Sequence, residues 1–220
     1  MSEDIKKMFD EISPTYDKVN NIISFFTHIY FKKTAINLLK LENKNIKILD
    51  LCCGSGDLAN IIKKKYPKID VFGVDFSSKM LEIAKKKNKE INYLEADACK
   101  LPFGDNEFDC VIVGFGLRNI INKDIAIKEI YRIIKTNGIF MHLDFIGKSK
   151  FSFLYDFIVK ILLNFFITNK TPYFYLLNSK NTFFSNKELI DFVSRIGFLN
   201  VGVKKMFLNT VSICIFQKMD

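Results

Sequence analysis

Short apolar runs alternate with amphipathic stretches along the chain from Ile46 onward. The apolar runs, which are typical of buried strands, cover residues 46–53, 70–76, 91–97, 108–115 and 138–145. Between them, the stretches 57–66, 78–88 and 123–135 place apolar side chains at helical spacing. This alternation predicts an α/β fold with a mostly parallel sheet and helices on both faces. The carboxyl ends of the parallel strands then meet at one edge, where ligands bind.

The two ends of the chain depart from this alternation, and the whole predicts a single domain, 1–220. In chain order we expect a lid of two helices, a cofactor-binding core, an aromatic-rich insertion, and a helix followed by two strands: 1–45, 46–147, 148–184 and 185–220. Ser185, with a glutamate three residues later, predicts a capping box at the start of the last helix. The two final strands predict an antiparallel hairpin at the far edge of the sheet.

The chain is strongly basic, with a net charge of +9 from 33 Lys and Arg against 24 Asp and Glu. Lysine runs such as 63–65 and 85–87 are typical of solvated helix faces, and attraction to an anionic membrane surface is the second interpretation. No basic stripe is interleaved with aromatic residues, so we expect no nucleic-acid partner.

The remaining composition indicates a reduced, cytoplasmic protein. The five cysteines show neither a CxxC motif nor metal-site spacing, so no metal is expected. The N-terminus lacks an apolar signal core. The most apolar segment, 151–168, carries Asp156, Lys160 and Asn164 at four-residue spacing, which predicts an amphipathic helix rather than a membrane span. Peripheral contact with the inner face of the membrane is a further expectation.

The most informative motif is ILDLCCGSGDLA, residues 48–59. It predicts a strand that ends at Gly54, a tight turn, and a helix that opens near Asp57. The glycines at 54 and 56 let a ligand approach the backbone, and Asp75, at the end of the next strand, is placed to bind ribose hydroxyls. Since GSGDLA fits the pattern G-x-G-x-x-A, a dinucleotide is the rival ligand.

Two carboxylates favour S-adenosyl-L-methionine over a dinucleotide. Asp57 is expected at the helix opening, where a pyrophosphate would be held by the helix N-terminus. Asp50, in the first strand, adds a second negative charge near the same place. Carboxylates repel phosphate but tolerate a cation, and S-adenosylmethionine carries a sulfonium and an ammonium and no phosphate.

Two further places at the predicted edge carry polar groups. After the third strand, Asp97 and Ala98 are placed to read adenine through a carboxylate and a backbone amide, with a helix N-cap as a compatible alternative for Asp97. The fourth strand ends in GFGLRN, residues 114–119, beside the glycine loop. The alternatives for its polar end are a salt bridge for Arg118 and a turn or helix cap for Asn119.

Several motifs recur as a set over most of the chain, from about residue 6 to 217. They are MFDEISPTYDKVNNIIS, LDLCCGSGDLA, GVDFSSKML, ADACKLPFGDNEFD, FGLRN, YRIIKTNG, YFYLLNS and ELIDFVSRIGF. In these motifs the chain resembles the quinone C-methyltransferases of menaquinone and ubiquinone biosynthesis, which are class I S-adenosylmethionine-dependent enzymes with a Rossmann-like sheet. Many methyltransferases share the glycine loop, whereas FGLRN together with SPTYDKVN is far more restrictive.

The resemblance implies roles for individual positions. The residues that it assigns to S-adenosylmethionine are Ser55, Asp75, Asp97, Ala98 and Gly114. It assigns Arg118 and Asn119 to the quinol site. The chain departs from the family pattern at several positions: Ser55 replaces a threonine, Gly114 replaces a serine of some members, and Asp144 replaces a glutamate. The last change leaves any acid–base role at 144 open.

The implied reaction transfers a methyl group from the sulfonium to a ring carbon of a polyprenylated quinol, demethylmenaquinol. The ring must be reduced, because only the quinol makes that carbon nucleophilic. Arg118 is the candidate partner of a quinol oxygen and Asn119 the orienting amide. Tyr16 and Asp17 are candidates for a lid, His28 for a base or a packing residue, and His142 for a structural role.

Three alternatives remain open from the sequence. The close one is C-methylation of the benzoquinol of ubiquinone biosynthesis. The second is a class I methyltransferase for another small or lipid substrate, and the third is a non-catalytic cofactor-binding or assembly protein. The aromatic insertion at 148–184 is expected to line a channel for the prenyl tail, to rest on the membrane, or to pack as ordinary core. The sequence leaves the oligomeric state open.

Overall fold

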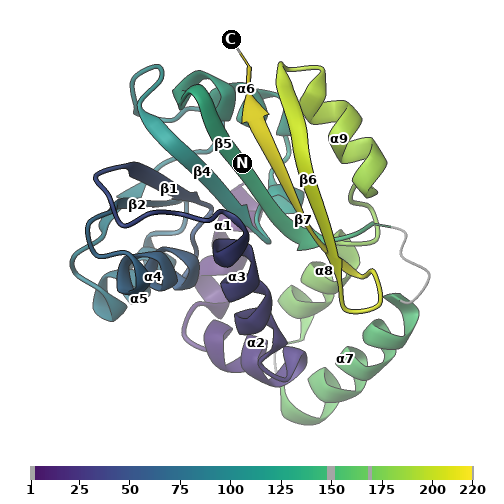
Figure 1. Ribbon diagram of the computed structural model, residues 1–220. Helices are drawn as coiled ribbons and strands as arrows, with labels where there is room; N and C mark the ends of the chain where they lie inside the picture. Colours follow the sequence, from purple (N-terminus) through teal and green to yellow (C-terminus); the bar gives the residue numbers. More distant parts are fainter. Residues whose placement is uncertain (1–2, 148–151, 168–169, 220) are drawn as a thin grey trace.

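A seven-stranded sheet with the order β3-β2-β1-β4-β5-β7-β6 forms the centre of the molecule (Figure 1). The computed structural model describes residues 3–147, 152–167 and 170–219. The strands are β1 Lys47–Leu51, β2 Asp70–Asp75, β3 Asn92–Glu95, β4 Phe108–Gly114, β5 Ile134–Phe145, β6 Phe198–Met206 and β7 Val211–Lys218. Strands β1 to β5 pair in parallel, and β7 lies antiparallel between β5 and β6. The predicted sheet, with its antiparallel C-terminal pair, is confirmed.

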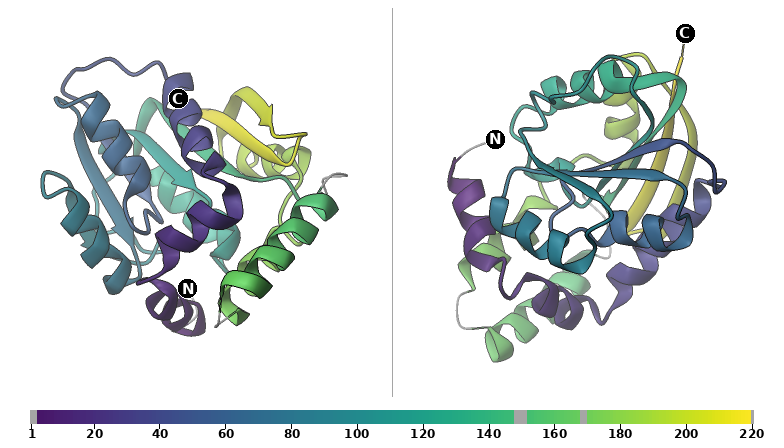
Figure 2. Two further views of the ribbon diagram at one scale, coloured as in Figure 1. Left: turned by 90° about the horizontal axis from the view of Figure 1, so that it is seen from below. Right: turned by 90° about the vertical axis from the view of Figure 1, so that its left-hand side faces the viewer.

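Helices cover both faces of this sheet (Figures 1 and 2). They are α1 Glu3–Ile12, α2 Tyr16–Ser24, α3 Thr27–Leu38, α4 Asp57–Lys65, α5 Ser78–Lys87, the 3₁₀ turn η1 Leu117–Asn119, α6 Lys123–Ile133, α7 Ser152–Phe166, α8 Thr171–Ser179 and α9 Asn186–Ser194. Buried side chains of α6 and α9 form a core with one face, and those of α3 and α4 form a core with the other. The two cores explain why the central strands read as continuous apolar runs.

The N-terminal segment contains three helices, so the prediction of two is wrong. Pro14 cannot continue a helix from α1, because it lacks the backbone N–H, and it also disfavours helical backbone at Ser13. A second break follows α2, where Phe25 and Phe26 take left-handed backbone with φ of 46° and 62°. The spacing of apolar residues continues across this second break, and phenylalanine is not a residue that marks the end of a helix. The break was therefore not visible in the sequence pattern.

The glycine loop between β1 and α4 begins earlier than predicted. Strand β1 ends at Leu51 rather than at Gly54. The residues Cys52, Gly54 and Gly56 have φ of 58°, 53° and 79°, and such left-handed backbone cannot belong to a strand. Helix α4 begins at Asp57, as the sequence predicts.

The last third of the chain follows the predicted order. At Ser185 a capping box is present: its hydroxyl accepts from Glu188 N, and Ser185 N donates to the Glu188 carboxylate. Strands β6 and β7 then form the predicted antiparallel pair, with β6 at the edge of the sheet. Their turn, residues 207–209, has positive φ throughout.

The aromatic-rich insertion folds as α7 and α8, and residues 148–151 and 168–169 of it lie outside the described part. These helices share a third, smaller core with the N-terminal helices. Its buried members are Ile12, Val19, Met80, Val159, Leu163, Tyr173 and Leu177. We call α1, α2, α7 and α8 the helical layer, which lies at the carboxyl edge of the sheet (Figure 1). In the described residues, no helix is long and apolar enough to cross a membrane. The division into lid, core and insertion stays a prediction.

Candidate active site

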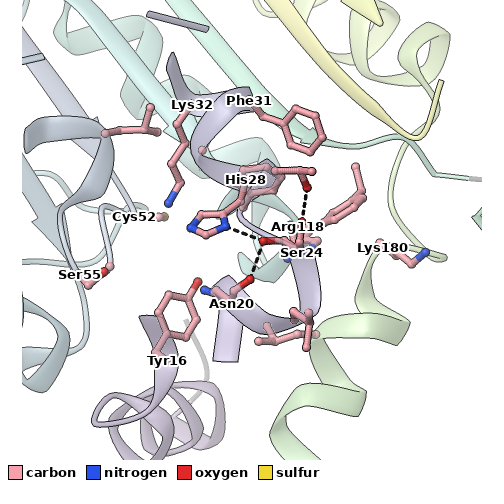
Figure 3. A pocket seen from close by; sticks show the side chains of 18 of the residues that line it. Tyr16, Asn20, Ser24, His28, Phe31, Lys32, Cys52, Ser55, Arg118 and Lys180 are labelled. Atoms are coloured by element: carbon pink, nitrogen blue, oxygen red, sulfur yellow. Dashed lines mark hydrogen bonds between the residues drawn. The ribbon is translucent and has the colours of Figure 1, made fainter. Parts of the chain in front are cut away.

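A pocket lies between the glycine loop and the helical layer (Figure 3). Its empty volume is about 1120 Å³, solvent at the mouth included. One wall comes from the β1–α4 loop and the ends of β4 and β5, and the other from α2, α3, α7 and α8. The apolar part of the second wall includes Ile23, Phe31, Val159, Leu176, Leu177 and Phe207. The pocket therefore joins a polar loop to an apolar chamber.

Four of the predicted cofactor residues line this pocket: Asp50, Gly54, Ser55 and Gly114. A methyl group added to Gly54 would meet no atom within 4 Å, so the loop backbone is open to a ligand there. At Gly114 the same addition would come within 2.3 Å of Leu58 Cδ1, so this strand end lies close against α4. The two glycines serve different needs, one for ligand approach and one for packing.

Asp50 is the buried carboxylate of the pocket. Its Oδ2 accepts a hydrogen bond of 2.9 Å from Ala59 N, near the start of α4. Burial raises the pKa of Asp50 to about 7, and the Ala59 hydrogen bond opposes that rise. A cation bound in this part of the pocket would lower the pKa again, since it favours the ionised carboxylate.

Asp57 is not the bare negative charge that the sequence predicts. Its two oxygens bind Lys32 and Lys87, each at 2.8 Å. Burial alone would raise the pKa of Asp57, but the two lysines outweigh burial and hold it well below its usual range. Because this carboxylate is neutralised within the protein, the preference for a cationic ligand depends on Asp50 instead.

The other predicted cofactor positions stand at the same edge but outside the pocket wall. The Asp75 carboxylate is buried and accepts from Gly54 N at 2.8 Å and from Ser77 N at 3.0 Å, so it shapes the glycine loop. Burial raises its pKa to about 6. Gly56 has φ of 79° and packs closely against Tyr93, with an added methyl group only 2.5 Å from the Tyr93 hydroxyl.

Asp97 and Ala98 follow β3, as predicted. The Asp97 Oδ1 accepts a hydrogen bond of 3.0 Å from Cys99 N, which makes a short turn and not the start of a helix. The helix-cap alternative for Asp97 is therefore wrong, because the next residues form only a single isolated bridge between Asp97 and Lys100. Neither residue lines the pocket.

The helical layer is fastened to the carboxyl edge by carboxylates of α1 and α2. Ser55 Oγ donates to Asp17 at 2.6 Å, and Ser77 Oγ donates to Asp10 at 2.5 Å. Tyr16, next to Asp17, lines the pocket. Helix α2 therefore lies against the glycine loop, and the Ser55 hydroxyl that the resemblance assigns to the cofactor is bonded to Asp17 here. A role of this segment as a lid stays a prediction.

Arg118 lies in the pocket wall opposite the glycine loop (Figure 3). It forms a salt bridge with the fully buried Asp144, and its Nε donates to Ser179 Oγ at 3.2 Å. Its guanidinium carbon lies 5.6 Å from the centre of the Phe145 ring. The salt-bridge alternative is thus confirmed, yet Arg118 also borders the pocket, so Asp144 positions it there.

Asn119 is not brought into the pocket wall. Its side chain is buried, and its Oδ1 accepts no hydrogen bond from the described residues. The cause is the 3₁₀ turn η1, in which neighbouring side chains point in directions about 120° apart. Arg118 consequently faces the pocket while Asn119 turns into the protein. The geometry gives no support to the predicted role of Asn119 as an orienting amide.

One more cation of the pocket, besides Arg118 and Lys32, could not be predicted from the sequence. Lys180 follows α8, is buried, and pairs with Asp156 of α7. Its Nζ lies 5.7 Å from the centre of the Phe145 ring, the ring that Arg118 also approaches. Burial lowers the pKa of Lys180, and Asp156 opposes that shift. The available signal was a lone lysine at the end of an aromatic run and a lone aspartate in an apolar helix.

The two histidines differ in position. His28 lines the pocket, and its Nδ1 lies 2.6 Å from Ser24 Oγ. Burial and the neighbouring Lys32 lower its pKa to about 4, so it is neutral at pH 7. His142 is buried in β5 against the Phe183 ring, with its pKa lowered to about 3 by burial and by Arg118. The structure thus agrees with a structural role for His142.

The sheet order and the ligand-facing glycine loop define a class I methyltransferase fold. Solved structures agree: a methyltransferase in complex with the Haloferax volcanii Trm112 activator matches with a TM-score of 0.75 and 16% identity, over 96% of this chain and 98% of that one. A SAM-dependent methyltransferase from Thermotoga maritima matches with a TM-score of 0.73 and 21% identity, over 96% and 99%. At these identities the likeness concerns the fold alone.

Sequence comparison then gives the family. The model of the ubiE/COQ5 methyltransferase family matches residues 1–218. The chain belongs to this family. Demethylmenaquinone methyltransferase of Staphylococcus carnosus (strain TM300) is 37% identical over 212 residues, which is 92% of this chain and 88% of the relative. The protein of the same name from Staphylococcus aureus (strain JH9) is 35% identical over the same shares.

Proposed function

We propose that this protein methylates a ring carbon of demethylmenaquinol, with S-adenosylmethionine as methyl donor, in menaquinone biosynthesis. The family and the names of both Staphylococcus relatives support this assignment. The observation that carries it is one pocket bordered by the open glycine loop on one side and by Arg118, held by Asp144, on the other. Such a pocket brings a methyl donor and an oxygen-bearing ring together in one place.

The residues of the loop side fit a cationic donor. Gly54 leaves the backbone open, and Asp50 presents a buried carboxyl group to the same space. The bound cofactor supplies the electrophilic methyl group. Asp50, in its ionised form, offsets the positive charge of the donor, and Gly114 keeps the end of β4 close to the loop. We expect Ser55 to bind the cofactor once its bond to Asp17 is exchanged.

On the opposite side, Arg118 is the partner of a quinol oxygen. A phenolic proton, with a pKa near 10, must be lost for the ring carbon to gain full nucleophilicity. The ring carbon takes the methyl group as the carbon–sulfur bond of the donor breaks and a thioether leaves, and it then loses its own hydrogen as a proton to solvent, which restores the aromatic quinol. The guanidinium of Arg118 and the ammonium of Lys180 stabilise the resulting oxyanion, which makes the proton easier to lose. Asp144 keeps Arg118 in place. His28 is neutral at pH 7 and a weak proton acceptor, since its pKa is lowered to about 4.

The apolar chamber suits a prenyl chain. Phe31, Val159 and Leu177 line it, and they come from α3, α7 and α8. Because a long prenyl chain stays in lipid, we propose a cytoplasmic protein in peripheral contact with the inner face of the membrane. Nothing in this arrangement calls for nucleic acid.

The test is methyl transfer from labelled S-adenosylmethionine by the purified protein to two reduced acceptors. We expect label in menaquinol when demethylmenaquinol is offered, and much less with the demethylated benzoquinol of ubiquinone biosynthesis. The reverse preference would assign the protein to the ubiquinone pathway. Transfer to neither quinol would overturn the proposal in favour of another small or lipid acceptor, and the absence of calorimetric cofactor binding would favour a non-catalytic role.

A further inference from the structure

Two turns of the protein present large apolar side chains on strained backbone. At the α2–α3 junction, Phe25 and Phe26 are 66% and 62% exposed and have φ of 46° and 62°. At the β6–β7 turn, Phe207 and Leu208 have φ of 47° and 52°, and Leu208 is 62% exposed. Bulky residues seldom adopt left-handed backbone. A fold that holds four of them there, mostly in contact with solvent, points to a use for these side chains outside the folded core.

The β6–β7 turn packs against α3, the helix that follows the first turn. The rings of Phe31 and Phe207 lie 6.1 Å apart, centre to centre, and both residues line the pocket. Tyr30, which is exposed, packs its ring against Phe31 at 6.0 Å. Both turns and α7 lie at the same, lower end of the molecule in Figure 1, the end that the left view of Figure 2 faces.

Helix α7 extends this apolar surface. Val159 and Leu163 point into the helical layer and are buried. The other side of the helix is exposed and large: Phe153, Phe157, Ile158, Ile161 and Phe165. Five large apolar side chains exposed on one side of a helix are unusual on a protein that contacts only water. We call the exposed side of α7, the α2–α3 junction and the β6–β7 turn the docking face.

The charges around the docking face have one sign. Its exposed lysines are Lys33, Lys160, Lys204 and Lys205. The sequence has no Asp or Glu at 18–41 or at 192–219. The one acidic residue described in α7, Asp156, pairs with the buried Lys180. Apolar tips ringed by lysines match a bilayer with anionic headgroups, in which the tips enter the acyl boundary and the lysines meet phosphate.

We propose that the docking face seats on an anionic lipid bilayer, with the mouth of the pocket turned toward the lipid. Phe207 belongs both to the pocket lining and to this face, and its ring contacts Phe31, which also lines the pocket. A prenylated acceptor then enters the chamber without crossing water. The proposed binding to the bilayer depends only on the properties of this surface, whereas the entry of an acceptor also depends on the proposed function.

The chain has no tryptophan, so a single introduced one reports on its own position. Phe26→Trp places it at the tip of the docking face, and Leu199→Trp places a matched control at the other end of β6, where Leu199 is 49% exposed. With vesicles of phosphatidylcholine and phosphatidylglycerol, we expect a blue shift and quenching by brominated lipid for Phe26→Trp only. Equal quenching of both, or of neither, would overturn the proposal.

A second experiment measures affinity for the same vesicles by sedimentation. The double variant Phe26→Ser/Leu208→Ser should bind at least about tenfold more weakly, since two apolar side chains lose their burial. The control Leu199→Ser/Val201→Ser, whose residues are each 49% exposed but lie toward the other end of β6, should bind like the unaltered protein. Molar salt or vesicles without the anionic lipid should also weaken binding. Equal binding by both variants would contradict the proposal.

Two readouts separate this proposal from the proposed function and from self-association. Methylation of a short-chain, water-soluble demethylmenaquinol should be unchanged in Phe26→Ser/Leu208→Ser, because neither residue lines the pocket. In the unaltered protein, activity without vesicle binding would overturn the docking face alone, and vesicle binding without activity would overturn the function alone. Light scattering tests self-association. If the unaltered protein is a dimer and Phe26→Ser/Leu208→Ser is a monomer, the face binds a second copy of the chain, and the lipid proposal is wrong.

Discussion

The two walls of the pocket are built in different ways. The loop wall belongs to the sheet, whose central strands are buried between two large cores. The helical wall belongs to a layer with a small core, in which buried side chains of α1, α2, α7 and α8 pack together. Its outer side carries the exposed apolar residues of the docking face. In the proposed function, the loop wall binds the methyl donor and the thinner helical wall binds the acceptor.

The largest effect should come from the cation that joins the two walls. In Arg118→Met, kcat for demethylmenaquinol should fall by about 10²–10³-fold, because the oxyanion loses its nearest charge. Cofactor affinity, measured by calorimetry, should not change. Arg132→Met is the matched control, since Arg132 pairs with Glu129 and Asp105 outside the pocket. Normal turnover in Arg118→Met would remove the residue from the acceptor side.

The next effect concerns the core of the helical layer. Leu177→Ala removes a buried side chain that also lines the pocket, at a cost of about 2–5 kcal/mol in the free energy of unfolding. The KM for the quinol should rise by about tenfold, in line with the lost apolar contact. Leu189→Ala, in the large core of α9, should be similarly destabilised in thermal unfolding, with an unchanged KM. A raised KM in both variants would mean that stability alone controls acceptor binding.

A smaller effect is expected from the glycine loop. Gly54→Ala forces left-handed backbone on alanine, at a cost of about 1–2 kcal/mol, and it fills space that the ligand needs. Cofactor affinity should fall by about tenfold, which corresponds to 1.4 kcal/mol. Gly202→Ala, in the open edge strand with no positive φ, should leave affinity unchanged. If calorimetry finds both variants normal, the ligand does not approach the backbone at 54.

The smallest effect is a pH dependence set by Asp50, whose pKa is about 7. Below that pH its carboxyl group is protonated and neutral, and above it the carboxylate attracts the cationic donor. Cofactor affinity should therefore rise about three- to tenfold from pH 6 to pH 8, and binding at pH 6.5 should release a proton. Calorimetry in buffers of different ionisation enthalpy measures that release. Asp50→Asn should show none of it.

The sheet side of the site was predictable from local sequence. The apolar runs predicted β1 to β5 because each run corresponds to one strand, although β3, at the edge of the sheet, is largely exposed. The glycines at 54 and 56 predicted the loop because only its backbone conformation requires them. Arg118 was predictable because its place at the end of a strand fixes the edge that it occupies. These features depend on residues close to one another in the chain.

The helical side was not predictable in the same way. The Tyr173 and Thr15 hydroxyls share a hydrogen bond although they are 158 positions apart in the sequence. Lys180 forms a salt bridge with Asp156 of another helix, and the spacing of apolar residues does not predict that pairing. The inward direction of Asn119 follows from a single 3₁₀ turn, which leaves no periodic signal. Asp57 resembles a free carboxylate until Lys32 and Lys87 are brought beside it by two other helices.

The most direct test of this account is equilibrium binding of each ligand alone to Gly54→Ala and to Leu177→Ala. The two walls predict opposite losses: Gly54→Ala should bind S-adenosylmethionine more weakly and demethylmenaquinol normally, and Leu177→Ala should do the reverse. If each variant weakens both ligands to the same extent, the walls do not act separately, and the division of the pocket into a donor side and an acceptor side is wrong.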